Sequence, residues 1–248
     1  MNNTSEYIAE GQVFHGFVPH VMGTRLEMLI IGKDEGHASE LWRAICDLVS
    51  RLDKMLNRFD PESDVSVLNN SDKPLESPMC EEFAGIAALA LDYRARTCGL
   101  FDITYAGGKL DFGGFGKGYF LKKCNEILRE AGVDCAFVDF GSSSILGIGH
   151  HPYGDHWQVG VVDPYTGNTV KTVCLRDSSM STSGNAPAYN GHIRNPHTGL
   201  PCDGRKLVCV TSDNPLDAEV LSTVLMIAGT DERAAVMANF PDAEIMIL

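Results

Sequence analysis

A glycine-rich stretch that contains a lysine is the first feature of this sequence that can do chemistry. Four glycines and one lysine fall within six residues: Gly113, Gly114, Gly116, Lys117 and Gly118. Glycines strip side chains from a turn, so its backbone N–H groups can approach an anion closely. Apolar residues at helical spacing follow, which places the turn at a helix N-terminus, where an anion is favoured. Because the stretch matches neither the Walker A loop nor GxGxxG, it predicts either a phosphate site or a tight connection into a helix.

Polar residues in an otherwise apolar helix are the second such feature. Residues 215–229 are apolar over most of the helical circumference, which predicts a buried helix. Glu219, Ser222 and Thr223 stand at i, i+3 and i+4, so one carboxylate and two hydroxyls share a face. Hard oxygen ligands of this kind suit Mg²⁺. The same stripe is also consistent with a polar network in the core, in which Thr223 bonds back to its own helix.

A loop that contains two histidines is the third feature that can do chemistry. Residues 191–199 hold His192, Arg194 and His197 between two glycines, and together with residues 181–184 they are predicted to bracket a hairpin tip. A histidine here can act as a general base near neutral pH, and Arg194 can pair with an anion. A merely polar loop explains the pattern equally well.

Two further groups of polar residues have more than one interpretation. Asp102 lies between large apolar residues just before the glycine turn, either as an exposed loop carboxylate or as a ligand of the same site. His150, His151 and His156 precede a predicted strand, and their spacing matches no recognised metal pattern. We therefore interpret these three as solvated loop histidines.

Composition narrows the class of protein. The chain has 248 residues, is 44% hydrophobic and carries a net charge of −13, which disfavours nucleic acid and anionic membranes as main partners. We find neither a membrane-spanning run nor a secretion signal, so we expect a cytoplasmic protein. The eight cysteines form no CxxC pair, which favours buried thiols over a disulfide framework or a zinc site.

Hydrophobic periodicity gives the elements that must position these residues. The helices are predicted at 37–59, 80–96, from the glycine turn to about 131, at 215–229 and at 232–238. Strands are predicted at 13–18, 25–31, 135–140, 145–148, 157–162, 169–175 and 243–248. Residues 58–69 contain Pro61 and many turn-forming residues, so they are expected to break the first helix and to form turns and a cap. Met22 falls between the first two strands, where the pattern alone indicates a core residue.

Taken in order, these motifs resemble the FAD:protein FMN transferase (ApbE-like) family, over roughly residues 20–230. The resemblance rests on seven segments in the same order: His20-Val-Met-Gly-Thr, Arg58-Phe-Asp-Pro-Glu-Ser with Leu68-Asn69, Gly99-Leu-Phe-Asp-Ile-Thr, Leu110-Asp-Phe-Gly-Gly-Phe-Gly-Lys-Gly-Tyr, Thr182-Ser-Gly, His192-Ile-Arg-Asn-Pro-His-Thr-Gly and Ala218-Glu-Val-Leu-Ser-Thr. It implies an α+β fold, which we expect as a single domain over residues 1–248 with a mixed, largely antiparallel sheet flanked by helices.

The resemblance also implies an activity, flavinylation: Mg²⁺-dependent transfer of FMN from FAD to a Ser or Thr of a target flavoprotein, with release of AMP. It implies that FAD contacts fall on Met22, Phe59, Leu100, Phe101, Asp102, Asp111, Lys117 and Ile193. It implies that metal ligands fall on the Gly114 carbonyl, Glu219, Ser222 and Thr223. His192 takes the place of the histidine proposed to act on the attacking hydroxyl.

The chain departs from the family pattern at several positions. Glu219 stands where the family usually has Asp, Asn195 replaces an Asp, and Ser142 and Ser143 replace the second Gly and the Asp of a GGD turn. Asp217 lies near Glu219 in sequence but is expected to face elsewhere on the helix. We expect a short member of the family without a signal peptide. The alternatives to transfer are an FAD pyrophosphatase that uses water as acceptor, and a catalytically weak flavin-binding protein.

Overall fold

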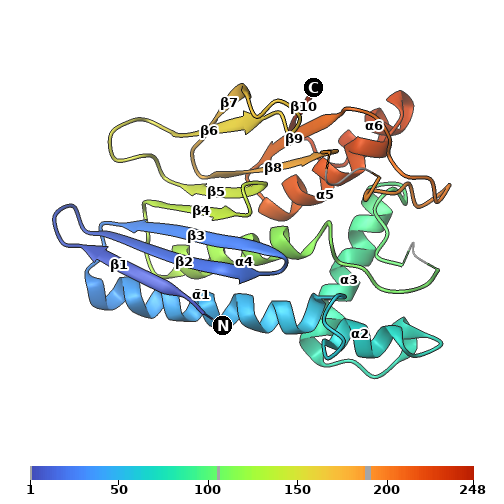
Figure 1. The fold of residues 1–248 in the computed structure, drawn as a ribbon, viewed down its shortest axis with the longest axis horizontal. Coiled ribbons are helices and arrows are strands. Elements are labelled where there is room, and N and C mark those ends of the chain that lie inside the picture. The colour runs from blue at the N-terminus through green and yellow to red at the C-terminus, as the bar shows by residue number, and fades with distance from the viewer. Residues whose placement is uncertain (1, 105–106, 188–190) are drawn as a thin grey trace.

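An eight-stranded sheet is the framework of the computed structural model, which describes residues 2–104, 107–187 and 191–248 (Figure 1). The strand order is β1-β2-β3-β4-β5-β8-β9-β10, and within the described residues all neighbouring strands pair antiparallel. The strands of this sheet are β1 (Thr4–Ile8), β2 (Val13–Val21), β3 (Thr24–Ile31), β4 (Ala136–Phe140), β5 (Ser144–Ile148), β8 (Ser178–Gly184), β9 (Leu207–Ser212) and β10 (Glu244–Ile247). A separate hairpin consists of β6 (Trp157–Val162) and β7 (Thr169–Leu175).

Three helices cover one face of the sheet. α1 (Glu35–Leu56) packs on β2 and on α4 (Gly116–Glu130), which in turn packs on β5 and α5 (Pro215–Ile227). α5 lies over β8 and β9. Figure 1 shows the remaining helices toward one end of the sheet. These are α2 (Asp64–Asn69), the 3₁₀ helix η1 (Pro74–Glu76), α3 (Glu81–Arg96) and α6 (Thr230–Met237).

The two faces of the sheet have different cores. Alternate residues of β3, Leu26, Met28 and Ile30, are fully buried under the helices, as the twofold period of a strand requires. On the opposite face the β6–β7 hairpin buries Trp157 and Val159 in a smaller cluster with residues of β5, β8 and β9. The site described below lies on the helix-covered face, where α4, α5, β5 and β8 meet.

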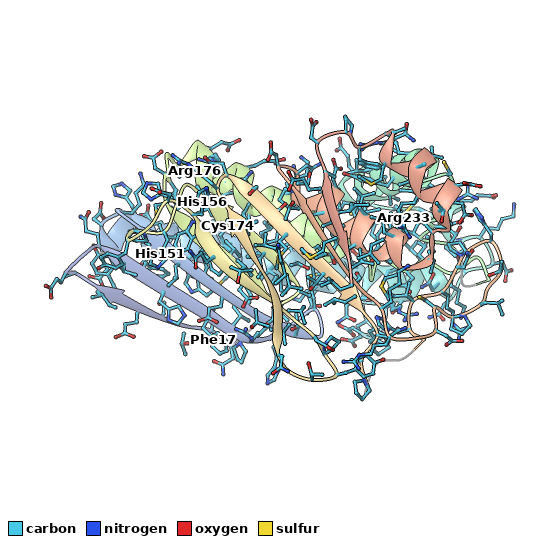
Figure 2. All side chains as sticks on the ribbon, turned by 90° about the horizontal axis from the view of Figure 1, so that it is seen from above. Phe17, His151, His156, Cys174, Arg176 and Arg233 are labelled. Carbon is cyan, nitrogen blue, oxygen red and sulfur yellow. The ribbon has the colours of Figure 1, made fainter. Side chains whose placement is uncertain are left out.

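The three loop histidines lie outside this core. His150, His151 and His156 are exposed, and Figure 2 shows His151 and His156 in the loop before β6, toward the same end of the hairpin as Arg176. His150 Nδ1 lies 3.0 Å from the Gly154 carbonyl oxygen of its own loop. Among the described residues, no group of three or more His, Cys, Asp or Glu side chains is arranged to hold a metal ion.

The α+β prediction is confirmed, and most strand and helix predictions are correct to within a few residues. The first helix, however, was predicted to continue through Phe59 and ends at Leu56. The Asn57 side chain accepts a hydrogen bond from the Phe59 backbone at 3.0 Å, which turns the chain before Pro61. Phe59 is consequently 81% exposed, and its apolar character was wrongly counted toward the helix.

Five of the described elements were not predicted: β1, α2, η1, β8 and β9. β1 is an exposed edge strand, so it lacks the hydrophobic alternation that identifies a strand. The segment predicted to contain turns and a cap includes the short helix α2, which Ser63 caps by accepting a hydrogen bond from Ser66 N at 3.1 Å. Residues 181–184 belong to β8, and residues 191–199 lie in the long connection from β8 to β9.

The eight cysteines are free thiols, of which Cys46, Cys124 and Cys209 are buried. Burial raises the pKa of Cys46 and of Cys209 to about 11, so these two thiols are unreactive near neutral pH. The helices of the described residues are each too short or too polar to cross a membrane.

Candidate functional site

The glycines of the first motif allow three close contacts at the start of α4. A Cβ at Gly118 would lie 2.4 Å from the Cβ of Glu219, and one at Gly116 would lie 2.7 Å from the Met22 Cε. A Cβ at Gly114 would lie 3.1 Å from the Thr223 Oγ1. None of the three glycines has a positive φ, so close approach is what requires them. The motif therefore joins the N-terminus of α4 to α5 and to the β2–β3 turn.

This close contact brings Lys117 to Glu219. Lys117 Nζ lies 2.6 Å from Glu219 Oε1, and the two side chains are 21% and 4% exposed. The second carboxylate oxygen, Oε2, accepts hydrogen bonds from Ser144 Oγ at 2.5 Å and Ser181 Oγ at 2.9 Å. The Glu219 carboxylate is thus buried, and both of its oxygens have partners.

The hydroxyl groups of α5 continue the same network. Ser222 Oγ donates to the Glu219 carbonyl at 2.9 Å and lies 2.8 Å from Ser183 Oγ. Thr223 Oγ1 lies 3.4 Å from Ser183 Oγ. The prediction that these residues share one face is confirmed by these contacts, and the residue that bonds back to its own helix is Ser222. Asp217 faces elsewhere, as expected: it accepts hydrogen bonds from Tyr93 and Asn214.

The donor atoms around Glu219 have the chemistry that a magnesium ion requires. They are a carboxylate, two helix hydroxyls and the backbone at Gly114, which packs against Thr223. Mg²⁺ takes oxygen ligands and retains several waters, so one protein carboxylate is enough. Lys117 supplies the positive charge at Oε1 in this arrangement. The residues therefore fit a divalent ion on condition that the Lys117 ammonium moves away from Oε1.

Apolar residues assigned to the flavin by resemblance contact the start of α4. Met22 adopts a left-handed conformation with φ of 47° in the β2–β3 turn, and its side chain reaches Gly116. Leu100 and Phe101 are buried, and the Phe101 ring stacks on Phe115 with centroids 5.9 Å apart. Because Phe115 immediately precedes α4, this stacking attaches the loop at 99–102 to the glycine motif.

Two of the carboxylates that the resemblance assigns to FAD, Asp102 and Asp111, are paired with arginines. Asp102 accepts hydrogen bonds from Arg94 Nε at 2.8 Å and from the Thr104 hydroxyl at 2.7 Å. Burial acts to raise the pKa of Asp102, but the hydrogen bonds from Thr104 and Arg94 outweigh it, and the pKa is lowered.

The second carboxylate, Asp111, accepts a hydrogen bond from Gly113 N at 2.9 Å and lies 3.2 Å from Arg58 Nη1. The Arg58 guanidinium also lies 4.6 Å from the centroid of the Phe59 ring, so it connects two of the predicted residues. Asn69 fixes the same stretch from α2: its side chain accepts from Leu110 N at 2.6 Å and donates to the Leu110 carbonyl at 2.9 Å.

The histidine loop lies against the loop that carries Leu100 and Phe101. His192 is exposed and the neighbouring Ile193 is buried. A Cβ at Gly99 would lie 2.8 Å from His197 Nε2, so the His197 ring packs on that glycine. Arg194, which was expected to be available for an anion, donates to the Gly199 carbonyl of its own loop at 3.1 Å.

Sequence reasoning missed Ser144, Ser181 and Ser183 as members of the site. All three face the helices from β5 and β8. Ser181 and Ser183 are two residues apart in β8, so they share a face, but residues 178–184 are mostly Ser and Thr, and no apolar alternation in the sequence indicated that face.

Comparison with known proteins shows the family. The ApbE family model matches residues 22–107 and 104–247, which is most of the chain. The chain belongs to the ApbE family. An FAD:protein FMN transferase of Rhodobacter capsulatus is 31% identical over 143 residues, covering 53% of this chain and 26% of that protein. An FAD:protein FMN transferase of Klebsiella pneumoniae (strain 342) is 26% identical over 162 residues, covering 61% of this chain and 49% of that protein.

The matched region therefore spans only about a quarter to a half of the length of these two curated relatives, 26% and 49% respectively. The fold agrees over a larger extent. The crystal structure of the ApbE protein from Thermotoga maritima superposes with a TM-score of 0.80 at 21% identity, covering 95% of this chain and 94% of that chain. At this level of identity the likeness establishes the ApbE fold.

Proposed function

We propose that this chain transfers FMN from FAD to a Ser or Thr hydroxyl of a target flavoprotein, in a reaction that depends on Mg²⁺ and releases AMP. The observation that carries the proposal is the junction of α4 and α5, where Lys117 and Glu219 meet the hydroxyl stripe beside a helix N-terminus. An ApbE fold built around this junction supports a site for a pyrophosphate and its counterions. We expect the acceptor to be a cytoplasmic protein.

The reaction is a displacement at phosphorus. The oxygen of the acceptor hydroxyl attacks the phosphorus of the FMN half of FAD, and the bond from that phosphorus to the bridging oxygen breaks. AMP leaves with the bridging oxygen, while His192 takes the proton of the attacking hydroxyl. The exposure of His192 supports this role, because a protein acceptor must reach the base from outside.

Charge at the phosphates is neutralised by two kinds of group. Glu219, Thr223, Ser222 and the Gly114 carbonyl would hold the divalent ion, which withdraws charge from the phosphoryl oxygens when it is bound. Lys117 supplies an ammonium on the first turn of α4, near the positive end of the helix dipole. Binding the substrate pyrophosphate would draw the ammonium away from Glu219 and so vacate Oε1 for the ion.

The residues around α4 are assigned to the rest of FAD. Met22, Leu100, Phe101 and Ile193 supply apolar surface, and Phe59 is an exposed ring on the neighbouring loop. Asp102 and Asp111 supply acceptors for hydroxyl or amino groups of the nucleotide. Their bonds to arginines support fixed positions for these carboxylates.

The proposal is tested by incubating the purified chain with FAD and Mg²⁺, with and without candidate acceptor flavoproteins, and measuring AMP, free FMN and the acceptor mass. Transfer requires AMP and an acceptor heavier by one FMN unit. Equal amounts of AMP and free FMN without acceptor would assign an FAD pyrophosphatase instead. Flavin binding with no AMP release under either condition would mean that the chain binds flavin without catalysing a reaction.

A further inference from the structure

The two oxygens of the Glu219 carboxylate have different partners. Oε2 accepts hydrogen bonds from Ser144 and Ser181, whereas Oε1 faces only a cation among its described hydrogen-bond partners, the ammonium of Lys117. The strands thus hold one oxygen with neutral donors, and the helix side presents a positive charge to the other.

The position of both serines follows from strand pairing. β5 and β8 are antiparallel neighbours, and Ser144 lies directly opposite Ser181 in their register. Side chains of directly opposed residues project to the same face with Cβ atoms about 5 Å apart. Ser144 and Ser181 are 1% and 2% exposed, so their hydroxyls converge on a carboxylate that is shielded from water.

The length of glutamate is what allows this contact. The Glu219 Cβ lies 2.4 Å from the position that a Gly118 Cβ would take, so α5 packs directly on α4 at this residue. The side chain must therefore span the remaining distance itself. An aspartate is shorter by one C–C bond of about 1.5 Å, which would leave its carboxylate oxygens beyond hydrogen-bonding distance of both hydroxyls.

We propose that Ser144 and Ser181 are positioning residues which hold Oε2 of Glu219, so that Oε1 is the oxygen that binds the divalent ion. The inference rests on the metal part of the proposed function and adds how this chain uses Glu where its family usually has Asp. Serines that merely satisfied a buried carboxylate would affect folding stability alone. Positioning serines also govern metal affinity, and do so only while residue 219 is long enough to reach them.

The experiment is a calorimetric titration of Mg²⁺ into the protein saturated with FAD and without acceptor, so that the pyrophosphate holds Lys117 away from Oε1; the serine change is made in two backgrounds. Ser144→Ala with Ser181→Ala should weaken Mg²⁺ binding by roughly 10- to 100-fold when residue 219 is Glu, the usual effect of removing partners that orient a metal ligand. The same pair of changes in Glu219→Asp should alter the affinity by less than about twofold, because no bond is lost. Ser179→Ala is the matched control: Ser179 is equally buried on β8 but donates to the Ser212 carbonyl.

An equal loss in both backgrounds, an unchanged affinity, or a gain in affinity in the Glu219 protein would overturn the proposal. If the double variant does not fold, Ser181→Ala alone is titrated in the same two backgrounds, with the same criterion applied. If the unaltered protein binds no Mg²⁺, the metal part of the proposed function fails and this inference fails with it. A separate titration with FAD in the absence of metal shows whether the flavin assignment survives.

Discussion

Lys117→Met removes the only positive charge recorded on the Glu219 carboxylate among the described residues while keeping most of the side-chain volume. In the absence of metal this leaves a carboxylate that is 4% exposed with two hydroxyl donors and no cation. An uncompensated buried charge is strongly unfavourable, so the folded state should lose stability. Added Mg²⁺ should restore stability, because the ion can take the position that the ammonium occupied.

The magnitude follows from burial. Removing one partner of a buried ion pair costs about 3–5 kcal/mol, and the 21% exposure of Lys117 places this pair at the lower end, about 3 kcal/mol. In a chain of 248 residues this corresponds to a fall of roughly 6–12 °C in melting temperature. Lys117→Met should also weaken FAD binding, because the same ammonium is assigned to the pyrophosphate.

The assay is thermal unfolding of both proteins with and without saturating Mg²⁺, followed by circular dichroism. Lys123→Met is the control on the same helix, since Lys123 pairs with Glu126 at the surface and should contribute less than about 1 kcal/mol. A Lys117→Met protein that loses no more stability than the control would refute the buried-charge argument. A full loss that Mg²⁺ fails to reverse would instead refute the exchange of ammonium for the ion.

Three further predictions concern other parts of the site. His192→Ala should retain FAD binding and lose on the order of 10²- to 10⁴-fold in transfer rate, measured as AMP release; unchanged turnover would place the base elsewhere. Gly118→Ala should destabilise the fold by about 1–3 kcal/mol in chemical denaturation, because its Cβ would overlap Glu219; a neutral result would mean that α4 and α5 can separate freely. Asp102 has a lowered pKa, so its stabilisation is present above its ordinary pKa of 3.8 and is lost as pH falls through the folded pKa. The stability gap between Asp102→Asn and the unaltered protein should therefore be widest near neutral pH and close in acid, and a gap independent of pH would contradict the assignment.

Local patterns predicted the helices of the site well, whereas the strand β8 was not predicted. The spacing of apolar residues gave α1, α4 and α5, and the same spacing placed Glu219, Ser222 and Thr223 on one face of α5. These features depend on residues within one or two helical turns, which is the range over which periodicity carries information.

The contacts that define the site's charge could not be predicted in this way. Lys117 and Glu219 are 102 positions apart in sequence. Lys117 was predicted to contact FAD and Glu219 to bind the metal ion, so their contact with each other was not predicted. Ser144 and Ser181 reach Glu219 through strand register, which a single sequence does not specify. The exposure of Phe59 depends on a hydrogen bond from its own backbone to Asn57, and this local bond prevailed over helical periodicity.

Whether Glu219 supports metal-dependent FMN transfer is decided by measuring Mg²⁺-dependent AMP release from FAD in two variants, Glu219→Gln and Glu219→Asp. Gln keeps the size and the hydrogen-bonding end but removes the charge that attracts the ion. We expect Glu219→Gln to abolish Mg²⁺-dependent release while the protein remains folded, and Glu219→Asp to stay active with a changed Mg²⁺ requirement. An unaltered Mg²⁺ requirement in both variants would contradict this role, since the carboxylate would then serve only the core.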